Sequence, residues 1–375
     1  MQRLTKTIAA AALVATYLSG VAEAKSLKAA YYVSPKHPIG LAYQKLADAV
    51  KAETKGAVTI RLFGGESLLA AKAISDGVRD QVADIGQMIY TYTPAYYPHG
   101  VLINDMAMVG TNDTAAMMAF TELYLLGCPA CLEELGKQNQ LPMAGISTPP
   151  YMVIANGDFN SPEKMHLKKL RAGGSLWDRF AKAIGAIGVN MPTSGMYEAI
   201  SRGTLDGALY AVGGLKTHGL GDVAKQVILL NAGSFRAGSV FSMNKASWAG
   251  LTVDERKAFL RALPKGAVRG AIAYVKGEEE GLEVAKQKKI PVVEPHPDLV
   301  KLRAEFVESD LKQTVKTAKE ALGLSDAEKF VADYRKLYDK YDKLVQPIAD
   351  DEAKLAEVMY NEIYAKIDPT TFGVK

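Results

Sequence analysis

Strand-like and helix-like segments alternate in the first third of the chain, and this order constrains the fold most strongly. Residues 27–33 are predicted to form a strand, and apolar residues from Ile39 to Val50 then recur at helical spacing. Residues 58–63 alternate apolar and polar side chains as a half-buried strand does, and 82–89 is the next strand. This succession predicts a mostly parallel, doubly wound α/β sheet, whose ligands bind at the carboxyl ends of the strands.

A second set of α/β segments begins near residue 149. Residues 149–156, 168–172 and 207–212 are predicted as strands, with a helix over 175–188. The chain therefore contains enough elements for two α/β lobes. The remaining predicted elements are a strand at 239–244, a long helix around 265–289 and amphipathic helices after residue 321.

The composition excludes several classes of protein. A chain of 375 residues with 48% hydrophobic and 23% charged residues is not typical of a disordered protein. The net charge is +4 and the basic residues are interspersed, so we expect no nucleic-acid partner. The five histidines lack metal-ligand spacing, and the common hydrolase, nucleotide-binding and zinc-protease motifs are missing. We therefore expect neither an enzyme nor a protein that needs a metal or cofactor.

Residues 1–24 are predicted to be a cleaved signal peptide. Arg3 and Lys6 stand at the start of an apolar stretch, and residues 22–24 (Ala-Glu-Ala) match the small-residue pattern of a cleavage site. The apolar stretch is too short to span a membrane comfortably, and no other segment approaches that length. We therefore expect an exported mature chain that starts at Lys25 and is not inserted in a membrane.

The two cysteines of the chain, Cys128 and Cys131, are separated by a proline and an alanine. A C-x-x-C motif that follows a strand is typical of thioredoxin-like redox proteins, but the residues before Cys128 have a helical pattern. In an oxidising compartment, a local structural disulfide is the better interpretation.

Arg171 stands at the carboxyl end of the predicted strand 168–172, just before two glycines and a helix. A guanidinium can donate two parallel hydrogen bonds to a carboxylate and so fix its orientation, which a lysine does less well. In an exported two-lobed protein, this position suits an anionic ligand held between lobes that close by a hinge motion. The alternative is a surface arginine that pairs with an acidic side chain.

Three segments of the chain match the pattern of one protein family. Residues 78–98 carry the aspartate and the proline of the family's pattern. Residues 159–171 end in the family's signature arginine, which is Arg171 here. Residues 192–207 match a third motif, at Tyr197, Ala199, Gly203, Asp206 and Gly207. With all three segments in order, the chain resembles the DctP family, the solute-binding subunits of tripartite ATP-independent periplasmic (TRAP) transporters.

The resemblance implies a two-lobed periplasmic binding protein, or Venus-flytrap, with a long connecting helix. It also implies that Arg171 binds the ligand's carboxylate, that the protein lies in the periplasm, and that a membrane permease driven by an ion gradient receives the ligand. On this basis we expect lobe I to comprise residues 25–148 and 236–276, and lobe II to comprise residues 149–235 and 277–320. Residues 321–375 are expected to form C-terminal helices that pack on the lobes.

The chain departs from the family's pattern mainly at polar positions. Tyr151 stands where several relatives carry a second arginine, and Leu209 and Tyr210 stand where relatives often carry glutamate and asparagine. Gly195 replaces a glutamate, and Leu167 replaces a glycine. These substitutions remove polar partners and add aromatic faces, so Arg171 is expected to act almost alone.

One arginine beside an aromatic wall suits a monocarboxylate with a hydrophobic or aromatic body. The alternatives are a C4-dicarboxylate or 2-oxoacid ligand, a ligand-sensing receptor, and an exported enzyme on the same scaffold. Alternatively, these aromatic residues pack in the core, as aromatic residues usually do. The predicted ligand-binding residues are Arg171, Tyr151, Tyr210, Tyr90, Gln87, Trp177 and His37.

Overall fold

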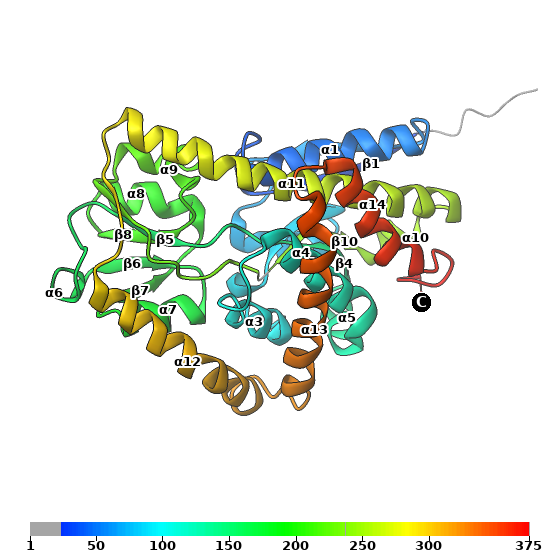
Figure 1. The fold of residues 1–375 in the computed structure, drawn as a ribbon. Coiled ribbons are helices and arrows are strands. Elements are labelled where there is room, and N and C mark those ends of the chain that lie inside the picture. The colour runs from blue at the N-terminus through cyan, green and yellow to red at the C-terminus, as the bar shows by residue number, and fades with distance from the viewer. Residues whose placement is uncertain (1–23, 237, 375) are drawn as a thin grey trace, which may run out of the picture.

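The computed structural model of the chain describes residues 24–236 and 238–374. The predicted signal peptide therefore lies outside the described residues, apart from its last position, Ala24. The described residues form two lobes that lie side by side, each built on its own β-sheet (Figure 1).

The sheet of the first lobe has the strand order β2-β1-β3-β10-β4, and that of the second has the order β11-β9-β5-β8-β6-β7. The strands of the first sheet are β1 (Lys25–Ala30), β2 (Val58–Phe63), β3 (Ile85–Ile89), β4 (Gln140–Gly145) and β10 (Gly238–Asn244). Those of the second are β5 (Met152–Ala155), β6 (Lys169–Ala172), β7 (Ile187–Asn190), β8 (Gly207–Tyr210), β9 (Gln226–Ile228) and β11 (Val292–Val293). The domain boundaries drawn from the sequence stay predictions.

Both sheets are mixed, although the sequence pattern predicts mostly parallel pairing. β1 runs parallel to β2 and β3, as expected. However, β10 runs antiparallel to β3 and β4, and β5 runs antiparallel to β8 and β9. Each of these two strands follows directly after a strand of the other lobe. Parallel pairing requires a crossover connection within one sheet, which β5 and β10 lack.

Short helices connect the strands within each lobe. In the first lobe these are α1 (Pro38–Glu53), α2 (Ile74–Arg79), α3 (Pro98–Asp105), α4 (Asp113–Glu122), α5 (Pro129–Lys137) and α10 (Lys245–Ala249). In the second lobe they are α6 (Pro162–Met165), α7 (Ser175–Ala183), α8 (Met196–Ser201) and α9 (Gly214–Thr217). Cys128 and Cys131 form a disulfide at the start of α5, the pairing that the sequence predicts.

The helix α11 (Val253–Gln287) extends over both lobes (Figure 1). The hydroxyl of Thr252 accepts a hydrogen bond from the backbone N–H of Glu255, whose carboxylate accepts one from the N–H of Thr252. This reciprocal arrangement is a capping box. With 35 residues, the helix is about 52 Å long, which is enough to connect the two sheets.

Two glycines of α11 allow close contact with each lobe. A Cβ atom added at Gly266 would lie 3.0 Å from the Cβ of Leu46 on α1, and one at Gly281 would lie 2.3 Å from the backbone oxygen of Val212 in the second lobe. Larger side chains at these positions would push the helix away from its partners.

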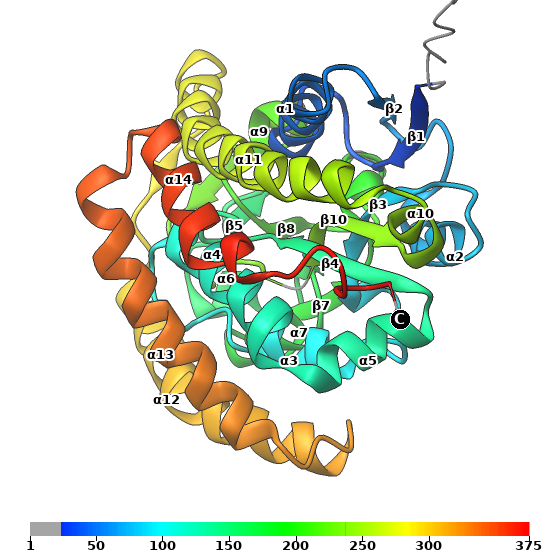
Figure 2. The ribbon, with the colours of Figure 1, turned by 90° about the vertical axis from the view of Figure 1, so that its right-hand side faces the viewer.

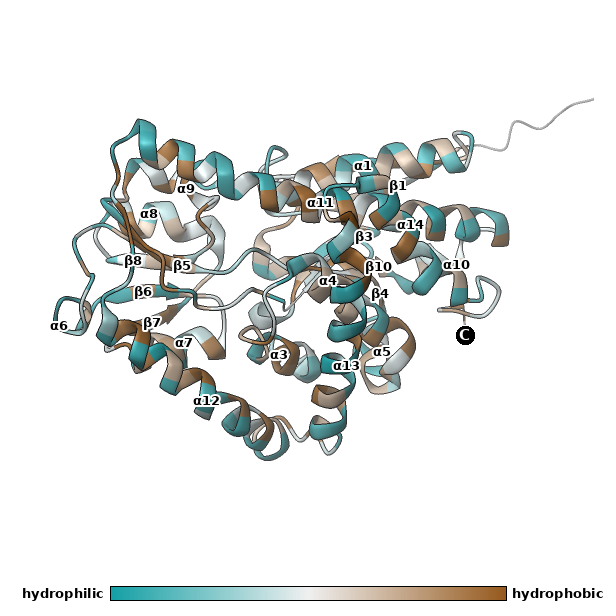
Figure 3. Ribbon diagram, viewed as in Figure 1, coloured by the Kyte–Doolittle hydropathy of each residue, from teal (hydrophilic) through white to brown (hydrophobic). Residues whose placement is uncertain are grey.

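Three C-terminal helices lie on the outside of the molecule: the first runs from the second lobe towards the first lobe, and the other two lie beside the first lobe (Figure 1 and Figure 2). They are α12 (Pro297–Glu320), α13 (Ala327–Val345) and α14 (Glu352–Glu362). Hydrophilic and hydrophobic residues alternate along α12 and α13 (Figure 3), as expected for helices with one face on a core. On α13, the Tyr338 hydroxyl accepts hydrogen bonds from the backbone N–H groups of Thr111 and Asn112, which fixes the helix to the first lobe.

Among the described residues, no single helix is both long enough and apolar enough to cross a membrane. Among the same described residues, one bent pair of helical segments passes this test together: α4 with the π-helical residues Leu123–Gly127 after it, and α5, at an angle of 84°.

Candidate ligand-binding site

Arg171 lies near the carboxyl end of β6, and its side chain is buried with 1% of the residue exposed. The Nε–H group donates a hydrogen bond of 3.0 Å to the backbone oxygen of Met191. The terminal nitrogen Nη1 has no hydrogen-bond partner, and no acidic residue in the described part of the chain forms an ion pair with the guanidinium. A buried charge without a counter-ion is unfavourable, so this site is suited to an anion supplied from outside the chain.

Four tyrosines surround the guanidinium. The Cζ atom of Arg171 lies 6.0 Å from the ring centre of Tyr210, and Tyr32, Tyr92 and Tyr151 are also close enough to influence its charge. Burial lowers the pKa of Arg171, but the four tyrosines raise it, and the net result is a pKa above the ordinary value. Burial likewise raises the pKa of Tyr151 to about 12, against the opposing effect of Arg171. At neutral pH the site therefore holds one positive charge among neutral hydroxyls.

The two lobes contact each other beside these tyrosines. Tyr32 follows β1 and Tyr92 follows β3, so both come from the first lobe. In the second lobe, the backbone N–H of Thr193 donates a hydrogen bond of 3.2 Å to the Tyr92 hydroxyl. The Thr193 hydroxyl also lies 3.5 Å from the hydroxyl of Tyr32. Side chains from both lobes are therefore brought together around Arg171.

Two histidines and a further tyrosine continue the same group of side chains. The His218 ring lies 4.9 Å from that of Tyr210 and 5.2 Å from that of His37, and the His37 ring lies 5.5 Å from that of Tyr274 on α11. These contacts join the first lobe, the second lobe and the connecting helix. We refer to the whole group as the interlobe cluster, and it comprises Tyr32, His37, Tyr92, Tyr151, Arg171, Tyr210, His218 and Tyr274.

Trp177 packs against the interlobe cluster. Its ring is fully buried and lies 4.7 Å from that of Tyr151 and 5.8 Å from that of Phe235. Its Nε1–H group donates a hydrogen bond of 2.8 Å to the backbone oxygen of Ala232. Trp177 thus supports the position of the Tyr151 ring, and its expected contact with the ligand stays a prediction.

Tyr90 and Gln87, which were also predicted to bind the ligand, have different surroundings. The Tyr90 ring packs in the first lobe against Tyr97 at 4.7 Å, Tyr124 at 5.9 Å and Phe120 at 6.4 Å. The structure therefore places Tyr90 in a separate aromatic group. Gln87 is buried in β3, and its Oε1 atom has no hydrogen-bond partner among the described residues.

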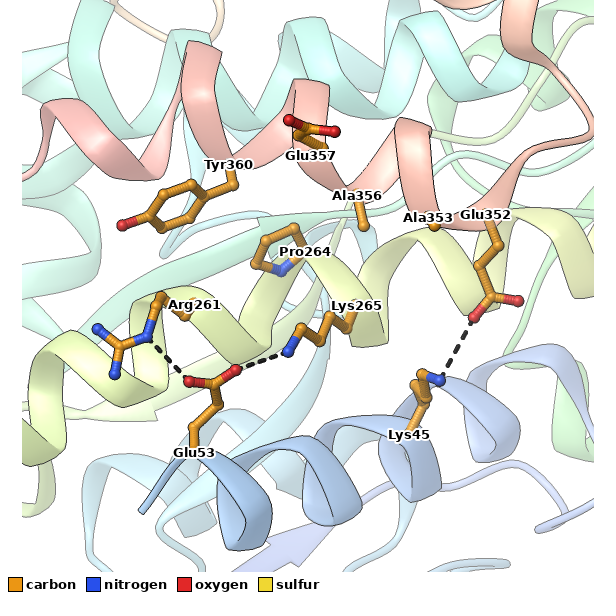
Figure 4. Close-up of a pocket in the computed structure, with 10 residues that line it drawn as sticks. All are labelled: Lys45, Glu53, Arg261, Pro264, Lys265, Glu352, Ala353, Ala356, Glu357 and Tyr360. Carbon is orange, nitrogen blue, oxygen red and sulfur yellow. Dashed lines mark hydrogen bonds and ion pairs between the residues drawn. The ribbon is translucent and has the colours of Figure 1, made fainter. Parts of the chain in front are cut away.

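A separate groove lies between α1, α11 and α14, with Pro264 of α11 and alanines of α14 along it (Figure 4). Each of its three basic side chains lies within 4 Å of a glutamate. Glu53 contacts Lys265 at 2.6 Å and Arg261 at 2.9 Å, and both basic groups lower the pKa of Glu53, while Lys45 lies 3.7 Å from Glu352. The cations of the groove therefore already have acidic neighbours, unlike Arg171.

Sequence reasoning identified Arg171, Tyr151, Tyr210 and His37 but missed four other members of the interlobe cluster. Tyr32 lies two residues after β1 and Tyr92 three residues after β3, so the rule that ligands bind at the carboxyl ends of strands pointed to both. His218 and Tyr274 had no comparable signal, because only the folding of α9 and α11 against the first lobe brings them near His37.

Solved structures of other proteins share this fold. A TRAP solute-binding protein from a marine metagenome, specific for aromatic acid ligands and crystallised with 3-hydroxybenzoate, is 20% identical, with a TM-score of 0.75 over 85% of this chain and 99% of that one. A TRAP solute-binding protein from Rhodoferax ferrireducens, in complex with copurified benzoate, gives the same values. One from Pseudomonas putida with bound D-glucuronate is 16% identical, with a TM-score of 0.66 over 84% and 96%.

The family assignment comes from the sequence match. The family model for DctP, the bacterial extracellular solute-binding protein family 7, matches residues 29–317. This range includes both sheets, the interlobe cluster and the whole of α11. The proteins of this family and its structural neighbours are solute-binding receptors rather than enzymes. The chain belongs to the DctP family of bacterial extracellular solute-binding proteins.

Proposed function

We propose that this protein is a periplasmic TRAP receptor for a monocarboxylate with an aromatic or hydrophobic body. The observation that carries the proposal is the buried guanidinium of Arg171, which has an unpartnered Nη1 and no acidic partner among the described residues. A ligand carboxylate would accept hydrogen bonds from this guanidinium and neutralise its charge.

The charge of the interlobe cluster favours one carboxylate over two. Arg171 is its only charged side chain at neutral pH, because burial lowers the pKa of His37 and that of His218, the latter to about 4. A dicarboxylate would therefore bring a second negative charge for which the cluster holds no cation. The faces of Tyr92, Tyr151 and Tyr210 instead suit an apolar or aromatic body. The aromatic acids bound by two of the structural neighbours agree with this choice.

We further propose that the mature chain works in the periplasm and delivers its ligand to the membrane permease of a TRAP transporter. Opening of the two lobes would admit the ligand, and closure would bring Tyr32 and Tyr92 against Thr193 around it. If the protein were instead an enzyme on this scaffold, incubation with the ligand would yield a product, whereas a receptor returns the ligand chemically unchanged.

The direct test is calorimetric titration of the mature protein, freed of bound ligand, with benzoate, succinate, pyruvate and D-glucuronate. We expect benzoate to bind most tightly. Arg171→Met should weaken it at least 100-fold, because a charge-assisted hydrogen bond contributes about 1.5–3 kcal/mol and a carboxylate accepts two from one guanidinium. Mass spectrometry of ligands that copurify with the wild type provides an independent identification.

Arg202→Met is the matched control. Arg202 directly follows α8 in the same lobe, but its side chain is 78% exposed and pairs with Glu198 on the surface. This variant loses the same charge and should keep the wild-type affinity. Tighter binding of succinate or pyruvate than of benzoate would contradict the proposed ligand class, and unchanged affinity of Arg171→Met would contradict the proposed anchor.

A further inference from the structure

His37 and His218 approach each other across the boundary between the lobes. His37 is the residue before α1 in the first lobe, and His218 follows α9 in the second. Their rings meet at 88° with centres 5.2 Å apart, and the His218 ring also contacts Tyr210, which lies beside Arg171. The protonation of the two rings can be assigned from their other hydrogen bonds.

The Nε2 atom of His37 is assigned as a donor without an acceptor. The Nδ1 atom accepts a hydrogen bond of 3.2 Å from the backbone N–H of Ile39, so it carries no proton. A neutral ring must then carry its proton on Nε2. That atom is buried and has no hydrogen-bond partner among the described residues. The edge-on contact with the His218 ring compensates only weakly for the missing acceptor.

The Nε2 atom of His218 is assigned as an acceptor. The Nδ1 atom lies 3.1 Å from the hydroxyl oxygen of Thr217, whose single proton is donated to the backbone oxygen of Gly213 at 3.0 Å. Because a carbonyl oxygen cannot donate, the proton between Thr217 and His218 must belong to Nδ1. In the neutral ring, Nε2 then carries a lone pair.

The two rings therefore offer one donor and one acceptor that come from opposite lobes. Burial lowers the pKa of both histidines, so neither is charged at neutral pH and neither attracts a carboxylate in competition with Arg171. A ligand hydroxyl matches this pair, because it donates one hydrogen bond and accepts another.

We infer that His37 and His218 recognise a hydroxyl group on the ligand, and that the solute is a hydroxy-substituted aromatic monocarboxylate. This inference rests on the proposed function, since Arg171 is taken to hold the carboxylate. The ligand hydroxyl donates to Nε2 of His218 and accepts from Nε2–H of His37. Because the two histidines belong to different lobes, the hydroxyl would contact both only in the closed protein and would stabilise closure.

The experiment compares ligands of equal size with and without a hydroxyl. The affinities of 3- and 4-hydroxybenzoate are measured by calorimetry against those of 3- and 4-methylbenzoate, with benzoate as the reference. The readout is the ratio of the hydroxy to the methyl affinity within each variant. In the wild type we expect at least one isomer to give a ratio of tenfold or more, because a site built for a hydroxyl rejects an analogue that lacks it.

Two variants remove one half of the pair each. His218→Phe keeps an aromatic ring beside Tyr210 but removes the acceptor. His37→Asn keeps a side-chain oxygen that can cap α1 but removes the Nε2 donor. Both variants should reduce the ratio to within about threefold of one. His296→Asn makes the same substitution at the N-cap of α12, outside the interlobe cluster, and should keep the ratio at tenfold or more.

The outcomes separate this inference from the proposed function. Equal binding of the hydroxy and methyl isomers by the wild type overturns the inference alone, since carboxylate capture by Arg171 then still holds. A ratio that survives both cluster substitutions, or one that is lost in His296→Asn, also overturns it. A wild type that binds none of the benzoates overturns the proposed function and the inference with it.

Discussion

Replacing Arg171 by methionine should leave the unliganded protein about as stable as the wild type, which is unusual for a fully buried arginine. The substitution removes one charge-assisted hydrogen bond, to Met191, at a cost of about 1.5–3 kcal/mol. It also removes the contact with the Tyr210 ring, which contributes about 0.5–2 kcal/mol. Against these losses, it relieves the penalty of several kcal/mol for a buried ion without a counter-ion. The net change in the free energy of unfolding should lie within about 2 kcal/mol of zero.

Arg236 provides the comparison, because it is equally buried but has a different environment. Its guanidinium donates hydrogen bonds to the backbone oxygens of Met106 at 3.1 Å, Val109 at 2.5 Å and Gly110 at 3.4 Å. It also lies over the ring of Tyr334 on α13, and its charge opposes the burial that raises the pKa of the nearby Asp113. Arg236→Met should therefore destabilise the protein by about 3–6 kcal/mol, since its two shorter charge-assisted bonds alone contribute that much and Asp113 offsets the burial of its charge.

Urea unfolding monitored by circular dichroism measures both effects, with and without benzoate at 100 times its Kd. Under these conditions the ligand should stabilise the wild type by about 2.7 kcal/mol, and Arg171→Met should show no such increase. A loss of 3 kcal/mol or more in unliganded Arg171→Met, similar to that of Arg236→Met, would refute this reasoning. The guanidinium would then be a structural element of the second lobe rather than a group awaiting an anion.

Three further predictions concern stability, each measured by urea unfolding. The pKa of His218 falls from 6.5 unfolded to about 4 folded, so the folded state binds fewer protons and stability is lost as pH falls from 6.5 towards 4. Between pH 7 and 4.5, His218→Phe should therefore lose about 2–3 kcal/mol less than the wild type, and equal losses would contradict the assignment. Trp177→Phe should lower stability by about 1–3 kcal/mol, because the buried oxygen of Ala232 loses its donor. Thr252→Ala should lose about 1 kcal/mol by removing the α11 cap, whereas Thr252→Ser should stay near the wild type.

The sequence by itself determined the local elements and pointed to Arg171 as the proposed anchor. Periodicity placed the strands β1, β2 and β3 and the helices between them, because side-chain spacing follows directly from backbone geometry. The capping box at Thr252 was also predictable, since its partners lie three residues apart. Arg171 was identified by its position at a strand end together with the motif around it.

The tertiary structure decided which side chains surround that anchor. After β3 the chain forms a short 3-10 helix, with about three residues per turn, so Tyr90 and Tyr92 point in different directions. Tyr90 consequently enters the core of the first lobe, while Tyr92 reaches Thr193. His37 and His218 are 181 positions apart in the sequence, and their contact exists only because the lobes meet. Sequence patterns record neighbours along one element, whereas a site between lobes depends on contacts that no local spacing encodes.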